Sequence, residues 1–314
     1  MKFSLTPLII GLSFACAPKD VTDPNDPTTD TGTATEPEDT VVWEDKRHGT
    51  SVTFQDAFTN GTEVFVVTTE GQTWKHQDDT WTNLPLNVDE ENINGIWGTG
   101  AGATLKMVGV GAAGTIITWT GETWETSQDS TSLFQAVDGE SSNDLMAVGG
   151  AGPWRNTGGT WTADAELGHE KFSDVWYDGT TGITVGDDGK IAWFTDGEWS
   201  LDEVGVDADL YSLDAINPSD VWVAGARGTL LHYNGTAWQS IDLGTQANMW
   251  DVWTPSAGVA YVVGANGQAY KVQGTLVERL HTGVNNILYS ITGTTEANIW
   301  ATGGRGVALH YTGG

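Results

Sequence analysis

The sequence predicts an all-β fold in which seven similar four-stranded units close into a ring. Three observations predict it: short apolar runs separated by turn residues, a repeat of 38 to 40 residues, and an N-terminal strand that completes the last unit. Four-stranded units at a period near 40 residues are typical of a β-propeller. We therefore expect a seven-bladed β-propeller of four-stranded antiparallel blades, with the N-terminal strand closing the last blade.

The repeating unit is clearest in residues 210–241, which read LYSLDAINPSDVWVAGARGTLLHYNGTAWQSI. Short runs of β-branched and aromatic residues alternate there with clusters of Gly, Pro, Asn and Asp, the pattern of strands joined by tight turns. Asn234-Gly235 and the Gly-x-x-Gly turn at 225–228 supply the positive-φ positions that hairpins need. Each unit is thus expected to contain four strands, A to D.

Two independent markers give the same period. Strand A opens on an apolar residue, at Phe54, Ile93, Leu133, Phe172, Leu210, Met249 and Leu288. The turn between strands B and C closes on a glycine, at Gly71, Gly114, Gly152, Gly189, Gly228, Gly267 and Gly306. Because the two markers agree over seven units, the repeat is specific for the fold.

A third marker predicts how the ring closes. Strand D carries a tryptophan at Trp81, Trp124, Trp161, Trp199 and Trp238, and the position near Leu276 is degenerate. No strand D follows the last A–B–C set, whereas residues 41–44 precede the first strand A. We expect Trp43 to lie in that missing strand and the recurring tryptophans to pack between blades. Closure also removes exposed sheet edges.

The N-terminal segment resembles a bacterial secretory signal, expected at residues 1–15, with Lys2 near its start and an apolar run at 8–12. Residues 12–16 resemble a lipobox, although the leucine stands four residues before the cysteine instead of three. The resemblance implies that Cys16, the single cysteine, becomes lipidated; an ordinary secretion signal is the alternative. Residues 16–40, rich in Pro, Thr and Asp, are expected to form a disordered tether, with the propeller at 41–314.

The charge restricts the partners. The chain has 42 acidic and 13 basic residues, a net charge of −29, which argues against nucleic acid because phosphate recognition needs basic patches. An envelope protein or an extracellular glycan is the expected partner, with membrane contact through the lipid anchor only. We expect a monomeric ring that is exported and lipid-anchored in the Gram-negative cell envelope, at the outer membrane or the cell surface.

No catalytic residue is predicted, because neither a Gly-x-Ser-x-Gly elbow nor a P-loop occurs. The six histidines show no metal-ligand spacing, and His232 and His310 occupy the same repeat position, so no metal site is expected. No cofactor is expected either, with structural Ca²⁺ held by acidic loops as the alternative. Asn60-Gly61-Thr62 fits the glycosylation pattern, but we interpret it as a turn.

The B–C turns and the D–A connections of such a propeller should share one face, around the mouth of the central channel. The candidate ligand-binding residues are the turn residues Glu70, Asp187, Asp188, Arg227, Asn266 and Arg305. Arg227 and Arg305 occupy the same turn position, so they could form a small anion-recognising spot. The alternative is that both are solvated turn residues that balance nearby acids.

Residues 220–238 resemble the repeat of propellers grouped with the photosystem II stability/assembly factor, and also BNR/Asp-box-type repeats. The Asp-box is eroded: residues 121–124 keep its Gly-x-Thr-Trp tail, but Trp119 replaces the aspartate. The resemblance covers residues 41–314 and implies a scaffold that holds other proteins. We therefore expect an envelope-anchored, non-catalytic binding or assembly scaffold. The alternative is a carbohydrate-binding or glycoside-hydrolase-like propeller that uses channel-mouth carboxylates and aromatics.

Overall fold

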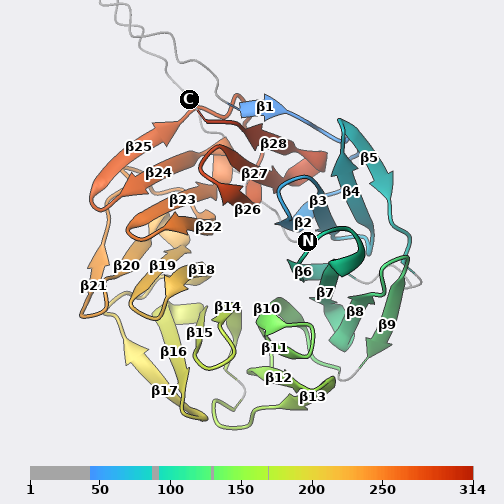
Figure 1. The fold of residues 1–314 in the computed structure, drawn as a ribbon. Coiled ribbons are helices and arrows are strands. Elements are labelled where there is room, and N and C mark those ends of the chain that lie inside the picture. The colour runs from blue at the N-terminus through green and yellow to red at the C-terminus, as the bar shows by residue number, and fades with distance from the viewer. Residues whose placement is uncertain (1–42, 87–91, 129–130, 169, 314) are drawn as a thin grey trace, which may run out of the picture. The chain divides into compact units, whose positions relative to one another are not determined.

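The computed structural model describes residues 43–86, 92–128, 131–168 and 170–313. These residues belong to one compact unit, Thr40–Gly314, and form seven four-stranded antiparallel sheets. Figure 1 shows the sheets arranged as blades around a common centre, where side chains of the innermost strands line cavities. The prediction of a seven-bladed β-propeller is confirmed. The predictions for residues 1–42, including lipidation of Cys16, concern a segment outside the described residues.

The strands follow one order in every blade, from the channel to the periphery. The innermost strands are β2 (Phe54–Thr59), β6 (Ile93–Thr99), β10 (Phe134–Ser141), β14 (Phe172–Tyr177), β18 (Leu210–Asn217), β22 (Met249–Ser256) and β26 (Leu288–Thr295). The second strands are β3 (Val64–Thr68), β7 (Lys106–Gly111), β11 (Asp144–Gly149), β15 (Gly182–Gly186), β19 (Asp220–Gly225), β23 (Val259–Gly264) and β27 (Asn298–Gly303). These two sets correspond to the expected strands A and B.

Strands C and D complete the blades. The third strands are β4 (Thr73–Gln77), β8 (Thr115–Trp119), β12 (Trp154–Thr157), β16 (Lys190–Thr195), β20 (Leu230–Tyr233), β24 (Ala269–Gln273) and β28 (Ala308–Tyr311). The outer strands are β5 (Thr80–Asn83), β9 (Trp124–Gln128), β13 (Thr160–Ala163), β17 (Glu198–Glu203), β21 (Trp238–Ser240), β25 (Leu276–Leu280) and β1 (Trp43–Asp45). Blades 1 to 7 are numbered by their innermost strands, β2 to β26.

Among the residues that the structure describes, helical structure is limited to short 3₁₀ turns. They are η1 (Gly102–Thr104), η2 (Ala112–Gly114), η3 (Asp187–Gly189), η4 (Ala226–Gly228), η5 (Ala265–Gly267) and η6 (Gly304–Gly306). Five of them, η2 to η6, are B–C turns, and all seven predicted closing glycines have positive φ. Within the described part of the chain, no helix is long and apolar enough to cross a membrane.

Every innermost strand has a β-bulge directly after its first residue. In blade 5, Leu210 pairs with Gly225 and Ser212 with Ala224, which leaves Tyr211 without a partner in the ladder. The other six blades show the same shift of register. A bulge re-aims the side chain of the extra residue, and here it distinguishes the second residue of each innermost strand.

Blade 3 corrects one predicted strand position. The innermost strand opens on Phe134, which is fully buried, whereas the predicted residue Leu133 is 42% exposed. Two adjacent apolar residues leave the register ambiguous by one, and a one-residue slip exchanges the two faces of a strand. The larger aromatic side chain takes the buried position.

The blades are held together by seven hydrophobic clusters, each built from two neighbouring blades. The tryptophans predicted in strand D lie in these clusters. Trp124 of blade 2 packs in a cluster with Phe65 of blade 1, and Trp81 of blade 1 packs near Trp300 of blade 7. The predicted packing role is therefore confirmed, and Val277 takes the degenerate position in blade 6.

Strand β1 closes the ring. It pairs with β28, Trp43 opposite Tyr311 and Asp45 opposite Leu309, so that blue β1 lies beside red β28 in Figure 1. Trp43 is only 4% exposed and belongs to the cluster between blades 6 and 7. The Trp81 indole Nε1 also donates a hydrogen bond to the Lys46 carbonyl, at 2.8 Å. The predicted clasp is confirmed.

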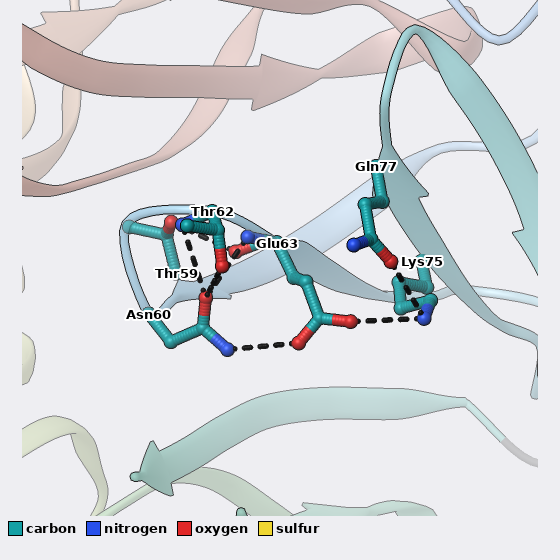
Figure 2. Close-up of polar contacts among 6 residues, drawn as sticks. All are labelled: Thr59, Asn60, Thr62, Glu63, Lys75 and Gln77. Atoms are coloured by element: carbon teal, nitrogen blue, oxygen red, sulfur yellow. Dashed lines mark hydrogen bonds and ion pairs between the residues drawn. The ribbon is translucent and has the colours of Figure 1, made fainter. Parts of the chain in front are cut away.

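Figure 2 shows the turn between β2 and β3, which contains the glycosylation-like sequence. Asn60 Oδ1 accepts the backbone N–H of Thr62 (3.1 Å) and of Glu63 (2.9 Å), and Asn60 Nδ2 donates to Glu63 Oε2. Glu63 Oε1 lies 2.9 Å from Lys75 Nζ. The Asn60 side chain therefore organises the turn, in agreement with the prediction.

Candidate functional site

The B–C turns and the D–A connections form one rim at a mouth of the channel. The first turn residue donates its N–H to the carbonyl oxygen of the residue that precedes the innermost strand, in the pairs Ala226–Asp209, Ala265–Asn248 and Gly304–Ile287. The glycine before each turn allows this approach, since a Cβ on Gly225 would lie 2.4 Å from the Asp209 oxygen. Turns and connections are thus on one face, as the sequence predicted.

The candidate turn residues have a fixed backbone and a variable side chain. The second residue of five B–C turns is left-handed, with φ between 52° and 60°, at Ala113, Asp188, Arg227, Asn266 and Arg305. Non-glycine residues adopt this conformation at a cost of roughly 1 kcal/mol. The fold therefore dictates the turn and leaves the exposed side chain free to differ between blades.

The structure does not gather all six candidate residues into one spot. Arg227 Nη2 forms an exposed ion pair with Asp207, at 2.7 Å, and the Asp188 N–H donates to Asp209. Asn266 and Arg305 line two adjoining cavities on blades 6 and 7. Asp187 lies near Tyr211, as described below, and exposed Glu70 lies in the B–C turn of blade 1.

A ring of seven side chains lines the channel mouth at this rim. They are the bulged second residues of the innermost strands: Gln55, Asn94, Gln135, Ser173, Tyr211, Trp250 and Tyr289. Together with five of the residues that follow them, they line a cavity of about 110 Å³: Asp56, Ala136, Asp174, Ser212 and Asp251. The ring is polar in blades 1 to 4 and aromatic in blades 5 to 7, so its two sides have different chemistry.

The aromatic rim is defined here as Tyr211, Trp250 and Tyr289. The rings of Tyr211 and Trp250 are stacked, 4.4 Å apart at 16°, and Tyr289 lies 5.6 Å from Trp250 at 54°. The Trp250 indole nitrogen is buried and has no hydrogen-bond partner among the described residues, so the accessible part of this half-buried side chain is carbon. Burial, followed by the Asp209 and Asp187 carboxylates, raises the pKa of Tyr211.

A groove leads outward from the aromatic rim. One cavity, of about 470 Å³, is lined by Asn285, Tyr289 and Arg305 among others, and a second, of about 280 Å³, by Asn266, Arg279 and Asn285. Asn285 lines both cavities, and Tyr289 lines both the first cavity and the channel mouth. We call the two cavities the blade 6–7 groove.

Five carboxylates along the channel connect neighbouring blades. Each accepts a backbone N–H from the next innermost strand at 2.6 to 2.9 Å, in the pairs Asp56–Ile96, Asp138–Tyr177, Asp174–Leu213, Asp214–Thr254 and Asp251–Ile291. These carboxylates are half-buried, because the channel reaches them. They are ties between blades, since the N–H groups that they accept belong to otherwise unpaired strand edges.

The environment of these carboxylates favours the protonated form. Burial raises the pKa of Asp138 and Asp251 to about 7 and that of Asp214 to about 6, although the backbone N–H donors act in the opposite direction. Burial also raises the pKa of Asp174 well above its ordinary value. The channel is thus lined by titratable carboxyl groups that also connect neighbouring blades.

Metal ligation finds no geometric support within the described ranges, where no group of three or more His, Cys, Asp or Glu could hold an ion. The two histidines in equivalent positions have packing roles. His232 stacks on Trp222 at 4.0 Å and its Nε2 lies 2.7 Å from Asp220 Oδ1. His310 stacks on Trp300 at 4.4 Å in the same manner.

Sequence reasoning missed the aromatic rim and the channel carboxylates. A signal for both was present at the start of strand A. The second residue is aromatic in three consecutive units, and the third or fifth residue is aspartate in five of the seven units. Neither pattern points to a direction in space until the bulge is known.

Of three comparisons with known proteins, only the one with solved structures finds similar proteins. No protein-family model matches the sequence, and a search of the curated proteins finds no match. Solved structures do match. "YCF48 bound to D1 peptide" has a TM-score of 0.70 and 14% identity over 87% of this chain and 97% of that chain.

Two further structures are similar. YCF48 from Cyanidioschyzon merolae has a TM-score of 0.68 and 16% identity, covering 86% of this chain and 98% of that one. The WD40 β-propeller domain of Doa1 has a TM-score of 0.71 and 10% identity, covering 84% and 94%. At these identities the likeness shows the fold alone. The similar structures include YCF48, whereas the BNR/Asp-box part of the expected resemblance stays a prediction.

Proposed function

We propose that this chain is a non-catalytic binding scaffold, anchored in the cell envelope through Cys16, that holds a protein partner on the channel-mouth face of blades 5 to 7. The observation that carries the proposal is the aromatic rim. Tyr211, Trp250 and Tyr289 occupy equivalent positions of three neighbouring blades and are half-buried at the mouth of the channel.

Such a cluster suits protein recognition. Tryptophan and tyrosine dominate the few residues that supply most of the binding energy of interfaces, because they offer large rigid surfaces at low entropic cost. Trp250 presents ring carbons and is braced by Tyr211, so little conformational freedom is lost on binding. The solved structure of YCF48 bound to D1 peptide adds that a propeller of similar fold carries a peptide.

The test is a cross-linked capture from the native envelope that compares the wild type with Trp250→Ala/Tyr289→Ala. The matched control is Gln135→Ala, a change at the same ring position on the opposite side of the channel. We expect a stoichiometric protein that the double variant loses and the control retains. A protein retained by both variants would move the site elsewhere.

The anchoring is tested separately. Replacing Cys16 with serine should release the protein from the membrane fraction and abolish labelling by a radioactive fatty acid, because Cys16 is the only cysteine of the chain. A Cys16→Ser protein that stays in the membrane fraction would contradict the lipid anchor. It would leave the binding scaffold unaffected.

A carbohydrate-active propeller is the second candidate, and one cavity favours it. At the opposite mouth, about 390 Å³ are lined by Trp97, Trp176, Trp253, Asp138 and Asp214. Aromatic platforms with carboxyl groups of raised pKa are typical of glycosidase sites. Both carboxylates, however, already accept hydrogen bonds from the next blade. Turnover of a glycan that Asp138→Asn abolishes would favour the enzyme.

A further inference from the structure

The blade 6–7 groove differs in charge from the rest of the chain. The protein has 42 acidic and 13 basic residues, yet no aspartate or glutamate lines either cavity of the groove. Two of the five arginines of the chain line the groove. They are Arg305, from the B–C turn of blade 7, and Arg279, from the outer strand of blade 6. The groove is therefore a basic strip on an acidic molecule.

Both guanidinium groups are available to a ligand. The ion pairs of the described residues engage Arg47, Arg155 and Arg227, and neither Arg279 nor Arg305 takes part in one. Both side chains are exposed. A guanidinium without an internal carboxylate keeps its five donors for an external acceptor, and its planar fork matches a carboxylate in a bidentate manner.

The other polar groups of the groove suit a polypeptide backbone. The exposed Asn266 and Asn285 side chains line it, and an amide offers both donors and an acceptor. Asn286, in contrast, is already used, because its Nδ2 donates to the Gly304 carbonyl at 3.1 Å. The groove thus combines two cationic positions with neutral amides, and its inner end is Tyr289 of the aromatic rim.

We propose that the blade 6–7 groove binds an extended, carboxylate-rich segment of the partner protein, with Arg279 and Arg305 as the residues that select acidic side chains. This inference rests on the proposed function, since the segment would continue from the aromatic rim outward over blades 6 and 7. Charge complementarity selects this occupant. A net charge of −29 disfavours acidic chains over the molecule as a whole, so an acid-free groove with two arginines would set the register of such a segment as well as its affinity.

The test is a selection of random peptides of about ten residues, which span roughly 33 Å when extended, on the immobilised full-length protein. The overall field favours basic peptides, so acidic enrichment cannot arise from non-specific attraction. We expect the selected peptides to be rich in Asp and Glu. Their Asn and Gln counterparts should bind about tenfold more weakly or worse, because charge-assisted pairs are lost.

Two variants locate the effect. Arg279→Gln/Arg305→Gln should remove the preference for acidic peptides, whereas Arg227→Gln, an arginine of the same face already paired with Asp207, should keep it. Acid-poor peptides, or acidic peptides that bind the double variant equally well, would overturn the inference. Peptides that depend on Trp250 but not on the two arginines would overturn it while supporting the proposed function.

Discussion

The contacts between blades and the side chains of the channel-mouth rim obey different rules. Between blades, the same kinds of residue recur: an outer-strand tryptophan such as Trp124 and an inner-strand aspartate such as Asp214. At the rim, equivalent positions diverge, from Gln135 in blade 3 to Trp250 in blade 6. Residues that recur from blade to blade therefore serve the packing that closes the ring. Residues that differ between blades at equivalent rim positions are the candidates for recognition.

The largest effect should come from breaking the interior of the ring at its closing strand. Removing residues 1–46 deletes β1 and exposes the cluster around Tyr311, whereas removing residues 1–38 leaves β1 intact. Because burial of one large aromatic residue is worth about 3–5 kcal/mol, the longer truncation should lower the free energy of unfolding by at least that amount. Equal melting temperatures for the two truncations would contradict the clasp.

A change between blades should act on stability and not on recognition. Trp124 is 3% exposed and packs between blades 1 and 2, so Trp124→Ala should cost about 3–5 kcal/mol. Denaturant unfolding measures this loss. Partner capture at a temperature where the variant remains folded should be unchanged, and a reduced capture there would break the distinction between the two regions.

The matching change at the rim should act in the opposite way. Trp250→Ala should abolish partner capture while its free energy of unfolding changes by about 1 kcal/mol, because the side chain is only half-buried. The measurement pairs the same denaturant series with the same capture assay. A Trp250→Ala protein as unstable as Trp124→Ala would assign Trp250 to the interior of the ring.

The pH dependence tests the channel carboxylates. The folded-state pKa of Asp214 is about 6, above its ordinary value of 3.8. Between pH 3.8 and 6 the folded state therefore binds more protons at this group than the unfolded state does. Stability from this group is complete below pH 3.8 and is lost as the pH rises toward 6.

Comparison with Asp214→Asn measures that contribution together with the smaller effect of the Asp214 charge on the pKa of Asp138. The opposite effect of His48, His76 and His310, whose pKa values burial lowers, is common to both proteins. Between about pH 4 and 6 the slopes of unfolding free energy against pH should differ between the two proteins. The expected difference corresponds to up to about one proton bound by the folded state of the wild type. Parallel plots would mean that folding does not raise the pKa of the Asp214 carboxyl group.

The smallest effect is expected at Arg227. Its ion pair with Asp207 is exposed at both ends, and such pairs contribute little. Arg227→Gln should leave the free energy of unfolding within about 0.5 kcal/mol and partner capture unchanged. Loss of capture in this variant would extend the binding surface to the B–C turn of blade 5 and restore the interpretation in which Arg227 and Arg305 act together.

The sequence predicted the features that repeat. The period, the closing strand around Trp43 and the inter-blade tryptophans follow from spacing alone, because each blade must bury the same surfaces. The carboxylate ties also left a periodic signal, since Asp138 and Tyr177 are separated by 39 residues and Asp214 and Thr254 by 40, close to one repeat. The direction of these carboxylates, however, depends on the bulge.

The rim could not be derived in the same way. The β-bulge places the first two apolar core positions of an innermost strand three residues apart, as at Leu210 and Leu213, instead of two. A regular alternating strand therefore gives the wrong direction for Tyr211, Trp250 and Tyr289. Arg227 and Arg305 share a repeat position but have different surroundings, a carboxylate in one case and an acid-free cavity in the other. Those surroundings come from connections that vary between blades.

The most direct test of the central claim places a photo-crosslinking residue at one ring position in two blades. Tyr289→p-benzoylphenylalanine and Gln135→p-benzoylphenylalanine occupy equivalent bulges on the aromatic and the polar side of the channel mouth. Irradiated in the native envelope, the first should give one dominant protein adduct and the second none. Adducts of equal yield from both positions, or from position 135 alone, would contradict recognition by the aromatic rim.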